Sequence, residues 1–336
     1  MDLRSHYLGL ELKNPLVPSA SPLSRDLDTA RQLEDNGAAA IVMYSLFEEA
    51  LNSEHERQLR LVNGQEHGHS EASNYLPMGS MLGSELDLYL EHLQGMKKAL
   101  DIPVIASLNG ISLDGWVENG KLLAEAGADA LELNAYTVAA DPLISGAEME
   151  VQYIALLKAL RQVVDIPIIV KLSPFFSSLG HFVKQLEEAG ANGVSLFNRF
   201  YQPDIDVDSL RVSAGLHLSH SSDSLLSMRW LGILHGRVNM TLAATGGIHT
   251  DEDAVKMILA GADVTHVCSV LLRHGPRHLR RILNGIGHWL EDSPYESLEQ
   301  ARGVLAHRQM DNPAAYERAS YVELLSGFSP NRLGWQ

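Results

Sequence analysis

The chain has 336 residues, 45% of them hydrophobic, which is enough to bury a sizeable core in one large domain or two small ones. Its formal net charge of −16 argues against a nucleic-acid partner, because phosphate contacts need clustered Lys and Arg, and favours a small-molecule substrate. The single cysteine, Cys268, excludes an internal disulfide. With no secretory signal and no apolar run of membrane-spanning length, we expect a cytoplasmic protein without a membrane partner.

The first predicted elements are a strand at residues 16–18, a small-residue turn at 19–21, and a helix at 26–36. The helix stops at Gly37, and a buried strand follows at 38–43. The next segment, 44–84, is long, polar and rich in Glu and His. Because it follows the second strand, we expect an active-site flap, with a solvated insertion as the alternative.

Two sequence phrases recur along the rest of the chain. A helix end, a glycine C-cap and a short apolar strand are predicted at 124–133, 187–196 and 259–267. A helix leading into a strand is predicted at 99–108 and 163–172. About eight strands therefore alternate with helices, which predicts a (β/α)₈ TIM barrel. A doubly wound open sheet is the competing fold, but no G-x-G-x-x-G follows the first strand.

The barrel is expected to span residues 1–290. Residues 291–336 are expected to form a helical extension packed on it, with helices at 298–306 and 314–325. A single domain with one appended segment follows.

The sequence T-L-A-A-T-G-G-I-H-T at residues 241–250 predicts a strand that breaks at Gly246 and Gly247 and a helix capped by Thr250, with a capping box to Asp253. A second strand, 264–267, ends at Cys268 and Ser269, ahead of a helix opening at Pro276. Two neighbouring strands thus end in small residues, whose backbone N–H groups can face one anion. We interpret this as a phosphate cradle at the mouth of the barrel.

In such a barrel the residues that follow each strand form the functional rim. This rim is rich in amides and hydroxyls, with one lysine, and it offers neither a paired-carboxylate site nor a metal site. His249 is expected either to touch a ligand or to pack at a helix start. The rim comprises Ala20, Ser21, Tyr44, Ser45, Ser107, Asn109, Asn134, Thr137, Lys171, Ser173, Asn198, Arg199, Gly246, Gly247, Cys268 and Ser269.

Lys171 interrupts the apolar phrase I-I-V-K-L, where a charge pointing into the helical layer would be buried without a partner. It is therefore expected to point to the barrel mouth. There it could form a Schiff base, hold a carboxylate, or donate a proton to a cofactor. The alternative is a lysine paired with a neighbouring barrel carboxylate such as Glu132, for which we expect a barrel-wall or core contact.

At these rim residues the chain resembles the dihydroorotate dehydrogenase family of FMN-dependent barrels, and in particular its dihydroorotate-dehydrogenase-like branch. The resemblance covers nearly the whole chain. It rests on N-P-L-V-P-S-A-S at 14–21, L-E-L-N at 131–134, V-K-L-S-P-F-F at 170–176, L-F-N-R-F-Y-Q-P-D-I-D at 196–206, A-T-G-G-I at 244–248 and C-S-x-L-x-x-x-G-P at 268–276.

The resemblance implies FMN as cofactor, an oxidoreductase acting on CH–CH donors in pyrimidine metabolism, and a possible homodimer. It implies that the FMN phosphate is held by the cradle residues, that the flavin and the substrate contact small and amide side chains, and that Lys171 lies by the N1–O2 edge. A cation suits that edge, since flavin reduction builds negative charge there. The implied phosphate contacts are Gly246, Gly247, Cys268, Ser269 and Ser219; Ala20, Ser21 and Ser45 line the flavin, Asn109 and Asn134 bond it or the substrate, and Asn198 faces the substrate.

The chain also departs from the family pattern. Tyr44 stands where the family has a lysine, and Thr137 stands where the family has a Cys or Ser base. The family's substrate-binding asparagine motifs have no clear counterpart at 76–84 or 137–142.

Three hypotheses follow. The first is an FMN-dependent oxidoreductase acting on the carbon skeleton of a small polar substrate, with Lys171, Thr137 and Tyr44 as catalytic residues. The second is a non-redox lyase or aldolase that uses Lys171 as a Schiff-base amine. The third is an FMN-binding barrel that has lost dihydroorotate turnover.

Overall fold

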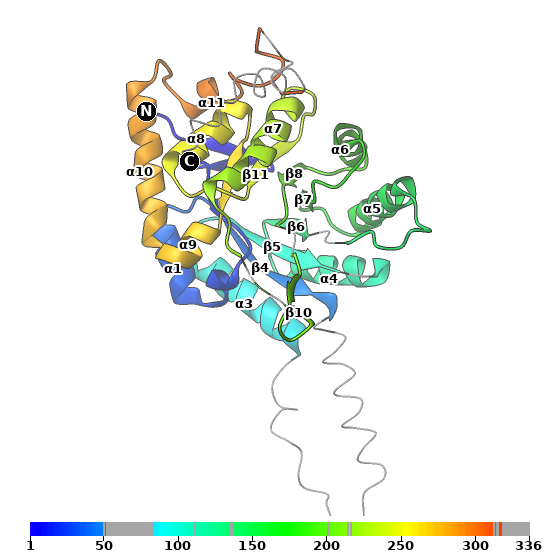
Figure 1. The fold of residues 1–336 in the computed structure, drawn as a ribbon. Helices are drawn as coiled ribbons and strands as arrows, with labels where there is room; N and C mark the ends of the chain where they lie inside the picture. Colours follow the sequence, from blue (N-terminus) through cyan, green and yellow to red (C-terminus); the bar gives the residue numbers. More distant parts are fainter. Residues whose placement is uncertain are drawn as a thin grey trace, which may run out of the picture.

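Eight parallel strands form a nearly closed barrel in this computed structural model, which confirms the predicted fold (Figure 1). The structure describes residues 1–49, 51, 84–110, 112–134, 137–199, 202–213, 215, 217–311, 313 and 316–317. The strands lie in the order β3-β12-β11-β8-β7-β6-β5-β4. They are β3 (Leu16–Pro18), β4 (Ile41–Phe47), β5 (Val104–Asn109), β6 (Ala130–Asn134), β7 (Ile168–Leu172), β8 (Gly193–Leu196), β11 (Thr241–Thr245) and β12 (Val264–Val267).

The two ends of this strand order, β3 and β4, are consecutive in the chain. Between them the Ala39 N–H donates to the Leu16 carbonyl at 2.9 Å. Asn14 adds a side-chain bond to the Gly37 carbonyl at 2.8 Å, so the turn after the first helix is tied to the start of β3. The barrel therefore closes through this connection.

Helices alternate with the strands and surround them (Figure 1). Gly261 ends one of them with a φ of +116°, a left-handed conformation that glycine adopts without strain, as the recurring glycine C-cap predicts. The helices are α1 (Leu27–Asp35), α3 (Glu85–Ala99), α4 (Leu113–Glu125), α5 (Gly146–Arg161), α6 (Leu179–Glu188), α7 (Ser224–Leu234), α8 (Asp251–Ala260), α9 (Ser269–His274), α10 (Arg277–Asp292) and α11 (Leu298–Ala301), with 3₁₀ turns η1 (Pro22–Arg25) and η3 (Ser221–Asp223).

The barrel interior has an apolar floor that the sequence did not predict. An N-terminal hairpin of β1 (Ser5–Tyr7) and β2 (Leu10–Leu12) packs its side chains into the bottom of the barrel. There Leu8 lies so close to Gly193 that a side chain on residue 193 would overlap Leu8. The cluster of buried floor residues is Tyr7, Leu8, Leu12, Val17, Ala39, Ala40, Val42, Ile105, Ala130, Ile169, Ala243 and Val264.

The second strand differs from its prediction at both ends. It begins at Ile41, because the Ala38 N–H bonds back to helix α1, and it continues to Phe47. Its register against β5 shifts between Val42 and Ser45, the mark of a β-bulge. The extra residue turns Met43 and Tyr44 both toward the helices and returns Ser45 to the interior. Simple alternation would have pointed Tyr44 inward.

Other elements were shorter than predicted or were missed. The helix expected at 298–306 ends at Ala301, since Arg302 is extended and Gly303 has a φ of +73°. From there the chain runs along α8, with the Gly303 N–H donating to Ile258 at 2.9 Å. Helix α9 and a hairpin of β9 (Asp204–Asp206) and β10 (Arg211–Ser213) were not predicted. Most of the predicted flap and of the helix at 314–325 lies outside the described residues, and the boundary at residue 290 stays a prediction.

In the portion of the chain that the structure describes, no helix is long and apolar enough to cross a membrane.

Candidate active site

A cavity of about 410 Å³ lies at the C-terminal ends of β3, β7, β8, β11 and β12. Its volume falls in the range of small-molecule sites. Nine of the residues predicted from the sequence line it: Ala20, Lys171, Asn198, Arg199, Ser219, Gly246, Gly247, Cys268 and Ser269. The structure thus brings together residues from the first strand and from the last four.

The predicted phosphate cradle forms one wall of this cavity. Gly246 and Gly247 have φ values of +89° and +73°, which side-chain-bearing residues rarely adopt. Open space lies where a Cβ of Gly246 would point, whereas a Cβ at Gly247 would overlap the backbone of Ser224. The Ser219 N–H donates to the Ser269 hydroxyl at 3.2 Å, so the preceding loop is tied to the cradle. Bare backbone and hydroxyl groups therefore face the cavity here.

Asp253 fixes the loops next to the phosphate cradle through hydrogen bonds. It is 5% exposed and accepts from the Ser221 hydroxyl at 2.7 Å and from the His249 and Thr250 N–H groups at 3.0 Å each. Although burial acts to raise the pKa of Asp253, these hydrogen bonds outweigh it and hold the pKa below its usual value. The predicted capping box of α8 is thus present, and its carboxylate also fixes η3.

His249 lies behind Ser219 rather than in the cavity lining. Its Nε2 is 3.0 Å from the Ser219 hydroxyl, and its carbonyl lies 3.1 Å from the His278 ring. Burial lowers the pKa of His249, and the nearby Arg273 acts in the same direction. A neutral His249 ring next to the Ser219 hydroxyl is compatible with both roles expected from the sequence, which were contact with a ligand and packing at the start of a helix.

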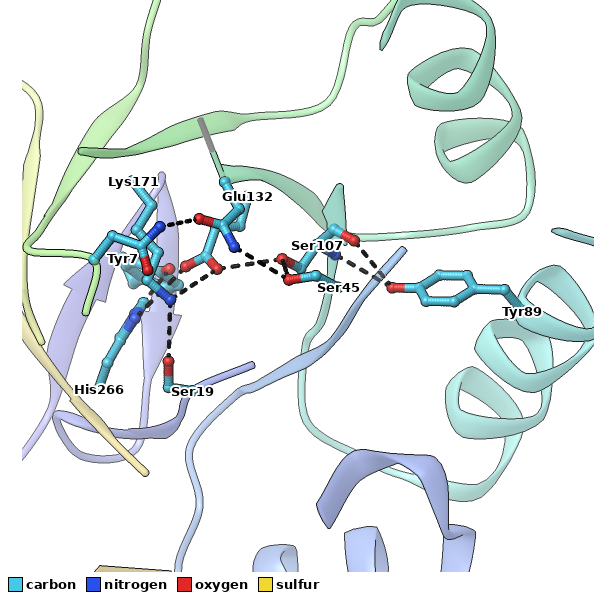
Figure 2. Close-up of polar contacts among 10 residues, drawn as sticks. Tyr7, Ser19, Ser45, Tyr89, Ser107, Glu132, Lys171 and His266 are labelled. Carbon is cyan, nitrogen blue, oxygen red and sulfur yellow. Dashed lines mark hydrogen bonds and ion pairs between the residues drawn. The ribbon is translucent and has the colours of Figure 1, made fainter. Parts of the chain in front are cut away.

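Lys171 points into the barrel interior at the cavity, as predicted, and it is also paired with Glu132. The two side chains are 8% and 0% exposed, and Nζ lies 3.4 Å from Oε1 (Figure 2). Nζ also lies 3.5 Å from the Ser19 hydroxyl. Glu132 therefore holds the Lys171 ammonium at the barrel mouth. The core contact predicted for Glu132 is confirmed.

Amide and hydroxyl side chains next to Lys171 and Glu132 form further hydrogen bonds. The Ser45 and Ser107 hydroxyls lie 2.9 Å apart, and the Asn134 amide donates to Ser45 at 3.4 Å. The Asn198 amide donates in turn to the Asn134 carbonyl oxygen. Asn109 is buried at the end of β5, and Ser21 is buried beside Ala20. These predicted residues surround the interior next to Lys171, although Ser21, Ser45, Asn109 and Asn134 do not line the cavity itself.

Two predicted catalytic residues do not line the cavity. The Tyr44 ring lies under the Arg25 guanidinium, 4.1 Å from its carbon, and packs edge-on against Tyr89 of α3 at 4.8 Å, because the bulge in β4 turns it outward. Thr137 lines a separate cavity of about 300 Å³ between α4 and α5. Burial raises the pKa of Tyr153, and its hydrogen bond to Thr137 acts in the opposite direction.

Two ionisable residues of the site were not predicted from the sequence. His266 on β12 is 1% exposed, lines the cavity and lies 3.8 Å from Glu132. The sequence does carry a sign of it, since His266 interrupts the apolar strand V-T-H-V as Lys171 interrupts its own strand. Asp223 also lines the cavity, where it forms an ion pair at 3.1 Å with Arg199, a residue predicted for the rim.

Comparison with known proteins identifies the family. The family model described as dihydroorotate dehydrogenase matches residues 2–290. The chain belongs to the dihydroorotate dehydrogenase family. It is 28% identical to dihydroorotate dehydrogenase A (fumarate) of Lactobacillus delbrueckii subsp. bulgaricus, over 78% of this chain and 85% of the relative. It is 26% identical to the catalytic subunit of dihydroorotate dehydrogenase B (NAD(+)) of Pyrococcus abyssi, over 90% and 98%, and 25% identical to that of Thermoplasma acidophilum, over 90% and 98%.

Dihydroorotate dehydrogenases are FMN-dependent oxidoreductases that act on CH–CH donors, so membership places this chain among them. The match does not support the lyase or aldolase alternative. The residues present fit FMN: the open space beside Gly246 leaves its backbone accessible to an anion. The buried cation at Lys171 suits the flavin edge that gains negative charge on reduction.

Proposed function

We propose that this protein is an FMN-dependent oxidoreductase whose substrate is a small polar molecule bound above the flavin, at the mouth of the barrel. The observation that carries the proposal is the placement of Lys171, which is buried, held by Glu132, and lines the same cavity as the glycine cradle. When bound, FMN supplies hydride transfer to or from a carbon atom of the substrate.

The residues of the cavity divide by chemistry. The backbone of Gly246, Gly247 and Ser269, with the Ser219 hydroxyl, would hold the phosphate. Ala20 and Ser21 would flank the ring system, and Lys171 would hold a positive charge beside it. The further flavin contacts we propose are Ser45, Asn109, Asn134 and Cys268.

Substrate recognition is assigned to amides. The Asn198 amide bonds Asn134, and Asn198 also lines the cavity, so these two side chains present donors and acceptors to a polar substrate. Dihydroorotate, which the names of the relatives give as their substrate, is the first compound to test. Catalytic roles for Thr137 and Tyr44 stay predictions from the sequence.

The test begins with the purified protein. We expect a flavin absorbance spectrum, release of FMN on denaturation as identified by mass, and bleaching of the spectrum when a substrate reduces the flavin. Protein that is colourless and takes up no added FMN would contradict the proposal. FMN that binds but is reduced by neither dihydroorotate nor a panel of small carboxylic acids and amides would favour the barrel that has lost turnover.

We further infer a homodimer in the cytoplasm. The single cysteine suits a reducing compartment. The β9–β10 hairpin carries four exposed apolar side chains, Ile205, Val207, Leu210 and Val212, and such a patch is typical of an interface. Light scattering should give twice the chain mass, and Leu210→Lys should shift it toward the monomer. Leu143→Lys, at an equally exposed leucine elsewhere, is the control.

A further inference from the structure

The interior of the barrel changes from apolar to polar between its floor and its mouth. Above the floor cluster, the side chains that point inward are hydroxyls and ionisable groups, all buried (Figure 2). They come from six different strands or strand ends. This polar layer comprises Ser19, Ser107, Glu132, Lys171, Ser195 and His266.

Three side-chain atoms in this layer have no hydrogen-bond partner among the described residues: Glu132 Oε2, Ser195 Oγ and His266 Nδ1. Unpaired polar atoms are costly in a protein interior. Two of the three face each other, because His266 Nδ1 lies 3.8 Å from Glu132 Oε2. Packing alone does not explain why these two unpaired polar atoms face each other.

The contact between Tyr7 and His266 fixes the orientation of the imidazole. The Tyr7 hydroxyl lies 3.1 Å from His266 Nε2. Burial raises the pKa of Tyr7 well above its usual value, and Glu132 adds to this, so the hydroxyl keeps its proton. A hydroxyl can donate to Nε2 or accept from it, but the Glu132 carboxylate facing Nδ1 favours the tautomer with its proton on Nδ1, in which Tyr7 donates to Nε2. Burial, followed by the charge of Lys171, lowers the pKa of His266 to about 3, so the ring is neutral. Nδ1 therefore carries the proton and presents it to Glu132.

The other oxygen of Glu132 faces Lys171 and Ser107. Oε1 lies 3.4 Å from Lys171 Nζ and 3.3 Å from the Ser107 hydroxyl. The titratable groups that face Glu132 are thus Lys171 from β7 and His266 from β12, with Tyr7 of β1 behind His266 and Tyr89 of α3 behind Ser107. Cys268 is near Lys171, but burial raises the pKa of this thiol and keeps it neutral.

We propose that Glu132 and His266 are positioning residues for Lys171, joined with Tyr7 in a buried relay that runs from the barrel floor to the flavin edge. The His266 N–H faces the far oxygen of Glu132 at 3.8 Å and fixes the orientation of the carboxylate. The near oxygen then holds the Lys171 ammonium in place without water. This inference rests on the proposed function only for the identity of the group above Lys171.

The first test needs no flavin. Nitrogen-15 NMR of the histidine side chains, with His266→Asn used to assign the signal, should show His266 as a neutral ring with its proton on Nδ1 across about pH 5 to 8. Tyr7→Phe should abolish this single tautomer. A His266 ring protonated on Nε2, or one that titrates like an exposed histidine, would overturn the relay whether or not FMN binds.

The second test uses a matched pair of variants and the midpoint potential of bound FMN. The amide nitrogen of asparagine takes the place of Nδ1, whereas that of glutamine takes the place of Nε2. His266→Asn should therefore keep the parent's midpoint potential. His266→Gln should lower it, because no N–H then faces Glu132 and the carboxylate holds the Lys171 ammonium less firmly beside the flavin.

The controls separate the outcomes. In the Glu132→Gln background the two His266 variants should have the same potential, and circular dichroism checks that each variant is folded. Identical potentials for the two His266 variants with Glu132 in place would refute the positioning role. If the protein binds no flavin, only the proposed function is contradicted, because the tautomer of His266 still tests the positioning role.

Discussion

Gly247 shows how one residue sets the shape of the cradle. Gly247→Ala adds a Cβ that overlaps the Ser224 backbone, on top of an unfavourable φ of +73°. Gly246→Ala meets no atom within 4 Å and incurs only the backbone penalty, of about 1 kcal/mol. We expect Gly247→Ala to lower the free energy of unfolding by clearly more than Gly246→Ala in urea titrations of flavin-free protein. Equal losses would contradict the close approach of Ser224.

The Lys171–Glu132 pair allows a double-mutant cycle. Lys171→Met leaves a fully buried carboxylate without its cation, which should cost about 3 to 5 kcal/mol of stability. Adding Glu132→Gln removes the stranded charge, so the double variant should be more stable than Lys171→Met alone. Urea unfolding of all four proteins measures the coupling energy. Additive losses would show that the two groups do not interact.

The sequence predicted these residues unevenly, for physical reasons. Lys171 was placed correctly because an unpaired charge cannot point into an apolar helical layer, whichever partner it finds. Tyr44 was misplaced, since a bulge that shifts the strand by one residue leaves no mark in the apolar pattern. The link from Tyr7 to His266 joins residues 259 positions apart, which no local pattern reports.

Among the elements, α8 has the most heavily used cap. Its Asp253 is buried and accepts from three groups, one on η3 and two in the turn before α8, whereas Glu148 makes the same capping box at α5 in an exposed position. Asp253→Asn should cost about 2 kcal/mol, because hydrogen bonds to a buried carboxylate are strong, and should also weaken FMN binding. Glu148→Gln should have a smaller effect on stability and leave FMN affinity unchanged. Fluorescence titration with FMN and urea unfolding check both.

Elements with a repeated phrase were predictable, and the short hairpin strands were not. Strands such as β6 and β8 were found because a glycine C-cap followed by an apolar run recurs along the chain. The β1–β2 and β9–β10 hairpins have three-residue strands, too short for a periodic signal. Helix α11 ends at Ala301, earlier than predicted, because Arg302 is extended and Gly303 has a positive φ, which the apolar pattern does not report.

For the whole molecule, acid stability depends on the buried interior. His266 has a pKa of about 3 in the folded protein against 6.5 as its ordinary value. Between these values the unfolded chain binds a proton that the native state does not, so stability falls as pH drops through this window, by several kcal/mol. Asp263, whose pKa burial raises to about 6, acts in the opposite direction. A comparison with His266→Gln isolates the histidine.

We therefore expect the urea midpoint of the parent protein to decline more steeply than that of His266→Gln between about pH 6.5 and 4. The two curves should converge toward acid pH. Parallel curves over this range would mean that His266 is protonated in the native state.

Finally, the β1–β2 hairpin means that the reactive end of the barrel depends on residues far apart in the chain. Tyr7 leaves the ribosome well before its partner on β12, which emerges only after more than 250 further residues. A nascent chain that ends at β11 has most of the barrel strands but lacks β12. Without His266 on that strand, Tyr7 has no partner, and Glu132 and Lys171 are not positioned. A chain that lacks the hairpin and still folds should consequently lose the single tautomer of His266, and adding the hairpin as a separate peptide should restore it.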